Sequence, residues 1–128
     1  MSDIIKFDPA LLEIFKSGAS SAPMPFSRDI LVLETRVAGT SRLNDPDALA
    51  ATLKRGDVLT MRREPQNEFD DFAILLFTTG EKAGYIPRDQ NEVIARLMDA
   101  GKTFFARIEE FYFQDDWLCI EIKAFMKD

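Results

Sequence analysis

The chain has 128 residues, of which 46% are apolar and 30% are charged, and these values are typical of a single globular domain with a modest core. There is no histidine, and Cys119 is the only cysteine, so the sequence offers neither an internal disulfide nor a zinc-type ligand set. No apolar run approaches the roughly 18 residues of a membrane span, and the first residues lack the pattern of a secretory signal. We therefore expect a cytoplasmic protein that needs no metal, no cofactor and no membrane.

The formal net charge of −6 bears on the kind of partner. Affinity for nucleic acid comes largely from lysine and arginine, which displace counterions from the phosphate backbone. An acidic chain is therefore not expected to cover a long duplex, whereas a compact site with a few local cations remains compatible with this charge.

The first 28 residues are predicted to form a helix and a linker. Asp8 and Pro9 are typical of a helix start and Gly18 of a helix end, and apolar side chains between them follow helical spacing. The linker, residues 17–27, is rich in serine, alanine, glycine and proline. A helix this short is marginal in water, so we expect its apolar face to dock either on its own chain or on a partner or second copy.

Residues 29–128 are predicted to form the main domain. Strands are expected at residues 30–37, 57–63, 72–77, 82–86, 103–113 and 117–125. Two helices interrupt them, the first capped by Asn44 or Asp45 and the second by Asp89, with Glu92 completing a capping box. Because the edges of so many antiparallel strands need protection, the predicted fold is mainly β (α+β): a small, partly open OB-like β-barrel of about six strands, with two inserted helices and the N-terminal helical appendage.

The most informative segment runs from Arg62 to Arg88 and reads RREPQNEFDDFAILLFTTGEKAGYIPR. It places an acidic turn between two apolar strands and follows them with a Gly-Tyr-Ile-Pro-Arg corner. This segment resembles the core signature of the HIRAN domain family, and the resemblance extends over residues 30–125. That family is a nucleic-acid-end binding module, fused to DNA-remodelling ATPases and nucleases and also found alone in bacteria and phages. The resemblance implies a stand-alone, non-catalytic module for single-stranded DNA ends or damaged or stalled-fork DNA, and it leaves room for a nuclease or helicase partner.

Phe69 and Asp70 form the first part of the predicted site. In this turn, Asn67 and Asp70 can fold their side chains onto nearby backbone amides, which is a purely structural role. An aromatic beside a carboxylate can instead stack on a base or sugar, while the carboxylate accepts a hydrogen bond from a terminal hydroxyl or an exocyclic amine. The resemblance favours the second role, since an aromatic-Asp pair at this place contacts the terminal nucleotide in eukaryotic members of the family.

Tyr85 and Arg88 supply a second aromatic and a cation at a strand end that leads into a helix. Arg88 and the free amides near Asp89 could hold a phosphate, and the structural alternatives are a half-buried tyrosine and a solvated surface charge. Two further cations are expected near terminal phosphates. The predicted nucleic-acid-binding residues are therefore Arg42, Arg63, Phe69, Asp70, Tyr85 and Arg88.

The segment after Gly39 departs from the family. Ligand-binding members carry there a basic residue followed by two aromatics that stack on the last bases, and this chain has Thr40-Ser41-Arg42-Leu43. Each base–aromatic stack is worth about 1–3 kcal/mol, so the departure implies weaker binding. The acidic turns do not favour a hydrolase. The acidic balance and the N-terminal helix do suit an alternative, a protein-protein interaction module that docks to a separately encoded DNA-processing enzyme.

Overall fold

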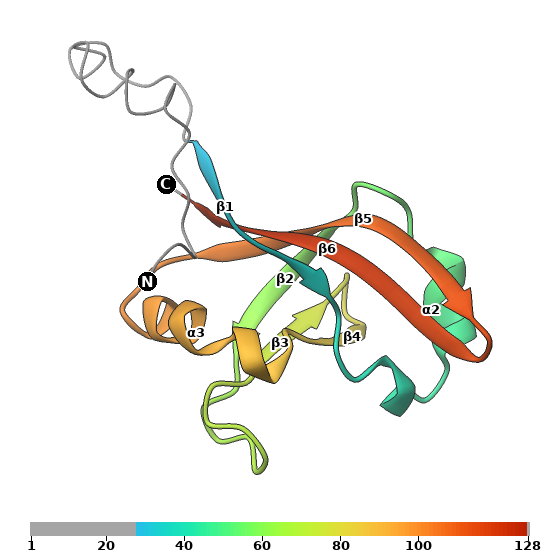
Figure 1. The fold of residues 1–128 in the computed structure, drawn as a ribbon, viewed down its shortest axis with the longest axis horizontal. Helices are drawn as coiled ribbons and strands as arrows, with labels where there is room; N and C mark the ends of the chain where they lie inside the picture. The colour runs from blue at the N-terminus through green and yellow to red at the C-terminus, as the bar shows by residue number, and fades with distance from the viewer. Residues whose placement is uncertain (1–27, 128) are drawn as a thin grey trace.

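The computed structural model of the protein describes residues 28–127, which form six strands, two α-helices and two 3-10 turns (Figure 1). The strands are β1 (Asp29–Arg36), β2 (Val58–Arg63), β3 (Ile74–Phe77), β4 (Lys82–Tyr85), β5 (Phe104–Gln114) and β6 (Trp117–Lys127). The helices are α2 (Pro46–Thr52) and α3 (Glu92–Asp99), and the 3-10 turns are η2 (Thr40–Arg42) and η3 (Arg88–Gln90). The predicted N-terminal helix and linker lie outside the described residues.

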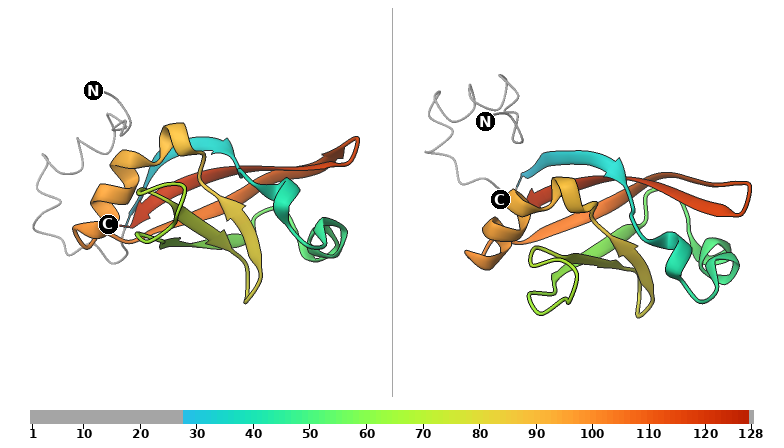
Figure 2. Two further views of the ribbon diagram at one scale, coloured as in Figure 1. Left: turned by 90° about the horizontal axis from the view of Figure 1, so that it is seen from below. Right: turned by 60° about the horizontal axis from the view of Figure 1, so that its bottom comes forward.

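All six strands belong to one antiparallel sheet, in the order β1-β6-β5-β2-β3-β4. The register shifts in three of the strand pairs, and such bulges bend a sheet. Figure 2 shows the result: the sheet curls, so that β1 and β6 form one wall and β2 and β3 the other. The structure is thus a curled half-barrel with two short helices, which confirms the prediction of a mainly β fold with six strands and two inserted helices.

The two end strands of the sheet meet at a single backbone bridge. Ala38, two residues after β1, pairs with Tyr85 at the end of β4 through two hydrogen bonds, with N···O distances of 2.8 and 2.9 Å. Gly84 makes this approach possible. Its φ is 149°, and a Cβ at this position would collide with the Ala38 carbonyl oxygen and lie 2.5 Å from Val37 Cγ1. The half-barrel therefore needs a glycine where its ends touch.

The hydrophobic core lies inside the curl and receives side chains from every strand. In β6, for example, the side chains of Leu118, Ile120 and Ile122 are almost completely buried. The helices, at opposite sides of the sheet in Figure 1, add Leu49 from α2 and Ile94 from α3. Truncating such a buried leucine or isoleucine to alanine typically costs about 2–5 kcal/mol. Cys119 is also buried, with 1% of its surface exposed, so it packs as a small apolar residue.

One of the two predicted helix caps is confirmed and the other is wrong. Asp45 caps α2, where its Oδ1 accepts a hydrogen bond from the Ala48 amide at 3.0 Å. Asp89 does not cap α3, because the chain after Pro87 first makes the η3 turn, and the helix begins only at Glu92. The predicted capping box is therefore also absent, and Glu92 pairs with Arg96 one turn later. None of the helices within residues 28–127 is long and apolar enough to cross a membrane.

Candidate nucleic-acid interface

The loop between β2 and β3, residues 64–73, has a fixed shape. Asn67 Oδ1 accepts a hydrogen bond from the Phe69 amide at 2.8 Å, and Asp70 Oδ1 accepts one from the Phe72 amide at 2.9 Å. These contacts confirm that both side chains fold onto the backbone two residues ahead. The base of the loop is closed by the Glu64 amide, which donates to the Ala73 carbonyl at 3.0 Å. In Figure 1 the loop projects below the sheet, and its internal hydrogen bonds hold the side chains on it in place.

Phe69 is what this loop carries into solvent. Its exposed fraction is 72%, which is the highest among the exposed large apolar side chains of the described residues. The ring contributes nothing to the core, and the backbone on either side of it is hydrogen-bonded. A large aromatic that a hydrogen-bonded loop holds in water is available for contact with a ligand or partner.

Asp70, the next residue, connects this loop to the start of α3. Its Oδ2 accepts a hydrogen bond from Asn91 Nδ2 at 2.7 Å, and the Asn91 side chain is buried. Each carboxylate oxygen of Asp70 therefore already accepts one hydrogen bond. A carboxylate has about four lone-pair positions, so each oxygen has room for one more donor.

Arg63 fastens the same loop from the other side. Its side chain is only 12% exposed, and its guanidinium donates to the carbonyl oxygens of Ala73 (2.6 Å) and Asp71 (2.9 Å) and to the Asp99 carboxylate (2.9 Å). All three guanidinium nitrogens take part in these bonds. The surroundings of Arg63 thus make it a clamp between the loop and α3, with little left to offer a phosphate.

Tyr85 stands over a half-buried carboxylate. Its hydroxyl donates to Glu64 Oε1 at 2.8 Å, Asn67 donates to the same oxygen at 3.1 Å, and Lys82 Nζ lies 4.7 Å from the centre of the tyrosine ring. Burial raises the pKa of Glu64, but the hydrogen bonds from Tyr85 and Asn67 and the charges of Lys82 and Arg62 outweigh it, so that the net pKa is lowered. Burial and the bond to Glu64 raise the pKa of Tyr85. The pair is therefore a carboxylate and a neutral phenol at neutral pH.

Arg42 and Arg88 are the exposed cations of the predicted set. Within residues 28–127, neither guanidinium forms an ion pair or a side-chain hydrogen bond. Arg42 ends η2 and shares with Lys82 the lining of a cavity of about 390 Å³. Arg88 begins η3, where Asp89 and Glu92 follow closely. The carboxylates of Asp89 and Glu92 repel a phosphate at the helix start. Binding of a phosphate at this place would therefore depend on the charge of Arg88.

The fold brings the segments that carry the six predicted residues into contact. Gly39, directly before η2, faces the Tyr85 ring, because a Cβ on this glycine would lie 3.8 Å from Tyr85 Cδ1. The loop joins Tyr85 through Glu64 and joins the residues after η3 through Asp70. The η2 turn, the loop and the β4–η3 corner thus form one continuous surface. Of the six residues, Arg42, Phe69 and Arg88 are the ones with unoccupied, exposed ends.

The sequence of the chain was compared with models of known protein families. The family model of the HIRAN domain matches residues 30–124, which is most of the chain. The chain belongs to the HIRAN domain family.

Two solved structures resemble this HIRAN domain. A protein from Lactobacillus plantarum is 28% identical, with a TM-score of 0.72, over 80% of this chain and 98% of that chain. The HIRAN domain of human HLTF is 13% identical, with a TM-score of 0.59, over 74% of each chain. At that identity the likeness to the human domain shows the fold alone. No curated protein matches the chain.

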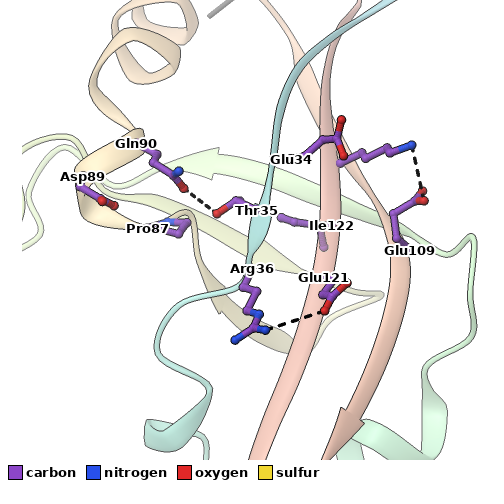
Figure 3. A pocket seen from close by; sticks show the side chains of 10 residues that line it. Glu34, Thr35, Arg36, Pro87, Asp89, Gln90, Glu109, Glu121 and Ile122 are labelled. Atoms are coloured by element: carbon purple, nitrogen blue, oxygen red, sulfur yellow. Dashed lines mark hydrogen bonds and ion pairs between the residues drawn. The ribbon is translucent and has the colours of Figure 1, made fainter.

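A groove of about 670 Å³ lies beside this interface, between β1, β6 and the η3 turn (Figure 3). Its lining includes four carboxylates, from Glu34, Asp89, Glu109 and Glu121, and two cations, from Arg36 and Lys123. Both cations are already paired, Arg36 with Glu121 at 4.0 Å and Lys123 with Glu109 at 3.6 Å. The groove therefore repels phosphates, and this HIRAN domain has its unpaired cations elsewhere.

Trp117, an exposed aromatic of this HIRAN domain, was not singled out from the sequence. It was assigned to an apolar strand, whereas 42% of it is exposed and its Nε1 donates to Thr40 Oγ1 at 3.1 Å. The start of β6 carried no clear signal, because Leu118, Cys119 and Ile120 are all buried and Cys119 shares a strand face with residue 117. Its contact with η2 could not have been predicted, since 77 residues separate the two partners.

Proposed function

We propose that this HIRAN domain is a non-catalytic module that binds the end of a single nucleic-acid strand, with DNA as the ligand. The observation that carries the proposal is Phe69, which is 72% exposed on a loop fixed by its own hydrogen bonds. Keeping a phenylalanine in water forgoes roughly 1.5–3 kcal/mol of burial, and a base stacked on the ring would recover part of this. Membership of a family of nucleic-acid-end binding modules supports the same ligand.

Each residue of the site receives a role in this proposal. Phe69 stacks on the terminal base or sugar, and Asp70 accepts a hydrogen bond from the terminal hydroxyl or an exocyclic amine with its remaining lone pairs. Tyr85 presents its half-exposed ring beside them. Arg42 and Arg88 meet the phosphates, because they are exposed and unpaired within residues 28–127. To Arg63 we assign the positioning of the loop, for which its bonds to Ala73, Asp71 and Asp99 are suited.

Binding is expected to be weak and to favour ends. The net charge is −6, the neighbouring groove is rich in carboxylates, and Arg42 and Arg88 are the two exposed cations of the predicted set that could displace counterions. A compact site of this kind covers only the last nucleotides of a strand. Damaged or stalled-fork DNA would be recognised through the free single-stranded ends that it offers.

Fluorescence anisotropy with a labelled linear single strand at low salt tests the proposal. The same sequence as an unlabelled circle, and as a blunt duplex, serve as competitors, and both should compete less well than the linear strand. Blocking the 3′ hydroxyl with a phosphate, and separately blocking the 5′ end, reads out the polarity. Equal competition by the linear and circular strands would remove the end-recognition claim, and a lack of binding to every strand at low salt would overturn the function itself.

The groove in Figure 3 favours a second candidate function, the docking of a partner protein. Four carboxylates against two paired cations suit a cationic protein segment better than a phosphate, and such a segment could belong to a separately encoded nuclease or helicase. A lysine-rich peptide titrated against the labelled domain would then shift the NMR signals of Glu34 and Glu121. Shifts confined to the loop around Phe69 would argue against this docking site.

A further inference from the structure

We propose that Trp117, on the β5–β6 hairpin, is a second stacking platform for an unpaired nucleobase of the same strand. The proposal rests on the function proposed above and extends that site across η2 onto the hairpin. It gives this chain an aromatic surface at the place where Thr40 and Ser41 supply none.

The indole of Trp117 is half exposed and yet held in one orientation. Its Nε1 donates to Thr40 Oγ1 at 3.1 Å, and the buried Thr40 hydroxyl in turn donates to the Leu118 carbonyl at 2.7 Å. The Arg36 guanidinium lies 5.7 Å from the centre of the ring. Arg36 is itself held by the Tyr112 hydroxyl at 3.3 Å. A ring held in this way loses little conformational freedom when a base stacks on it, so more of the stacking energy appears as affinity.

The position of Trp117 makes it continuous with the interface already described. Thr40, its hydrogen-bond partner, follows Gly39, which faces the Tyr85 ring. Trp117 and Ser41 line one shallow cavity of about 520 Å³, and on the other side of η2 Arg42 and Lys82 line another. Between the rings of Trp117 and Tyr85 the path thus offers two cations, Arg42 and Lys82, in a cavity that Asp45 and Glu81 also line. Proteins that bind single strands use this combination, because cations follow the backbone while aromatics take the bases.

The charges around the hairpin indicate on which side of Trp117 the bound nucleic-acid strand continues. Asp115 and Asp116 form the hairpin turn directly before Trp117, and their carboxylates repel phosphates over about 8–10 Å at physiological ionic strength. Arg42 ends η2, the segment that Trp117 contacts through Thr40, while Arg36 lies over the indole ring. The strand therefore leaves Trp117 away from the turn and runs across η2 toward Tyr85.

Trp117 is the only tryptophan of the chain, so its own fluorescence reports on the proposed contact. Saturation with an unlabelled linear single strand should quench its emission and shield it from acrylamide. In anisotropy with a labelled strand, Trp117→Ala should weaken binding about 5- to 150-fold, the equivalent of one stack, while Trp117→Phe keeps most of the affinity. Phe113→Ala is the matched control, because Phe113 is 41% exposed on the same hairpin. It pairs with Leu118 across the two strands, so its side chain lies on the sheet face opposite to that of Trp117. The affinity of Phe113→Ala should equal that of the wild type.

The possible outcomes separate this inference from the function on which it rests. Wild-type emission that is unchanged at saturation, or full affinity in both Trp117 variants, would overturn the stacking role and leave the strand-binding function standing. Failure of the wild type to bind any strand would overturn both proposals. Should Trp117→Ala lower the melting temperature, the wild-type quenching and the Trp117→Phe variant decide the matter. A strand with one abasic nucleotide adds a further test, since loss of quenching at a single abasic position supports the stack.

Discussion

Gly84 lies so close to Ala38 that a Cβ at Gly84 would collide with the Ala38 carbonyl oxygen. The contact lies at the bridge between Ala38 and Tyr85, where the first and last strands of the half-barrel meet. Because only Gly39 separates Ala38 from η2, this approach also sets the distance between Arg42 and the Tyr85 ring. A single glycine thus determines both the closure of the sheet and the spacing of the candidate site.

Gly84→Ala is therefore expected to destabilise the domain by about 2–4 kcal/mol, since both the collision and the strained φ must be relieved by moving backbone. Urea unfolding followed by circular dichroism measures this. Gly80→Ala is the control, because Gly80 also has a positive φ, 81°, but has nothing within 4 Å, so only about 1 kcal/mol of backbone cost is expected. Equal effects of the two substitutions would contradict the close approach.

Phe69→Ala and Asp70→Ala should differ in their effects, because Phe69→Ala should change strand binding whereas Asp70→Ala should change stability. Phe69→Ala should leave the melting temperature unchanged and weaken strand binding about 5- to 150-fold, because it removes an exposed ring and no internal contact. Asp70→Ala should cost about 1–3 kcal/mol of stability, because it leaves the buried Asn91 amide without the acceptor that it has now. Thermal melts alongside anisotropy titrations give both readouts. A large drop in melting temperature for Phe69→Ala would mean that the ring is structural.

Arg88→Ala should lower the slope of log affinity against log salt by about one unit, out of a total of roughly two to four, and leave any sequence preference unchanged. The loss reflects one phosphate contact fewer. Arg55→Ala provides the comparison, since Arg55 is engaged with Glu110 at 2.7 Å beside the hairpin and should not alter the slope. If the two variants give the same slope as the wild type, Arg88 lies away from the strand.

Stability should depend on pH through Glu64 and Tyr85. Glu64 has a pKa below its ordinary value of 4.5, so its contribution is present above about pH 4.5 and is lost as the pH falls through the lowered folded-state value. Tyr85 has a pKa above its ordinary value of 10.0, so its contribution is present below about pH 10 and is lost as the pH rises through the raised value. The stability difference between wild type and Tyr85→Phe should therefore be greatest between these limits and shrink on either side.

Urea unfolding at a series of pH values measures this difference. Glu64→Gln keeps a hydrogen-bond acceptor but cannot ionise, so the step in acid assigned to Glu64 should be missing from this variant. A step of unchanged size in Glu64→Gln would assign the acid sensitivity to another carboxyl group.

Much of the local structure was predictable because it depends on neighbours in the chain. The alternation of apolar residues identified the six strands, and the residue types at Asp45 and Pro46 identified the start of α2. The side chains of Asn67 and Asp70 fold onto amides two residues away, which sequence alone indicates. The cap of α3 was wrongly predicted because an extra 3-10 turn after Pro87 moves the helix start, and the Asn91 side chain is directed to Asp70, 21 residues earlier.

The sequence by itself determined the fold class, the family and the residue types available for binding, since these follow from periodicity, turn chemistry and the signature between Arg62 and Arg88. Only the tertiary structure decided which of those side chains are free. Arg63 and Arg88 look alike as isolated cations, yet Arg63 is held by Asp99, 36 residues away, while Arg88 remains exposed. Trp117 was predicted only as the start of a strand, and the structure shows that it is 42% exposed and hydrogen-bonded to Thr40, 77 residues earlier. Availability depends on long-range contacts, and those contacts form only when the sheet curls and brings distant segments together.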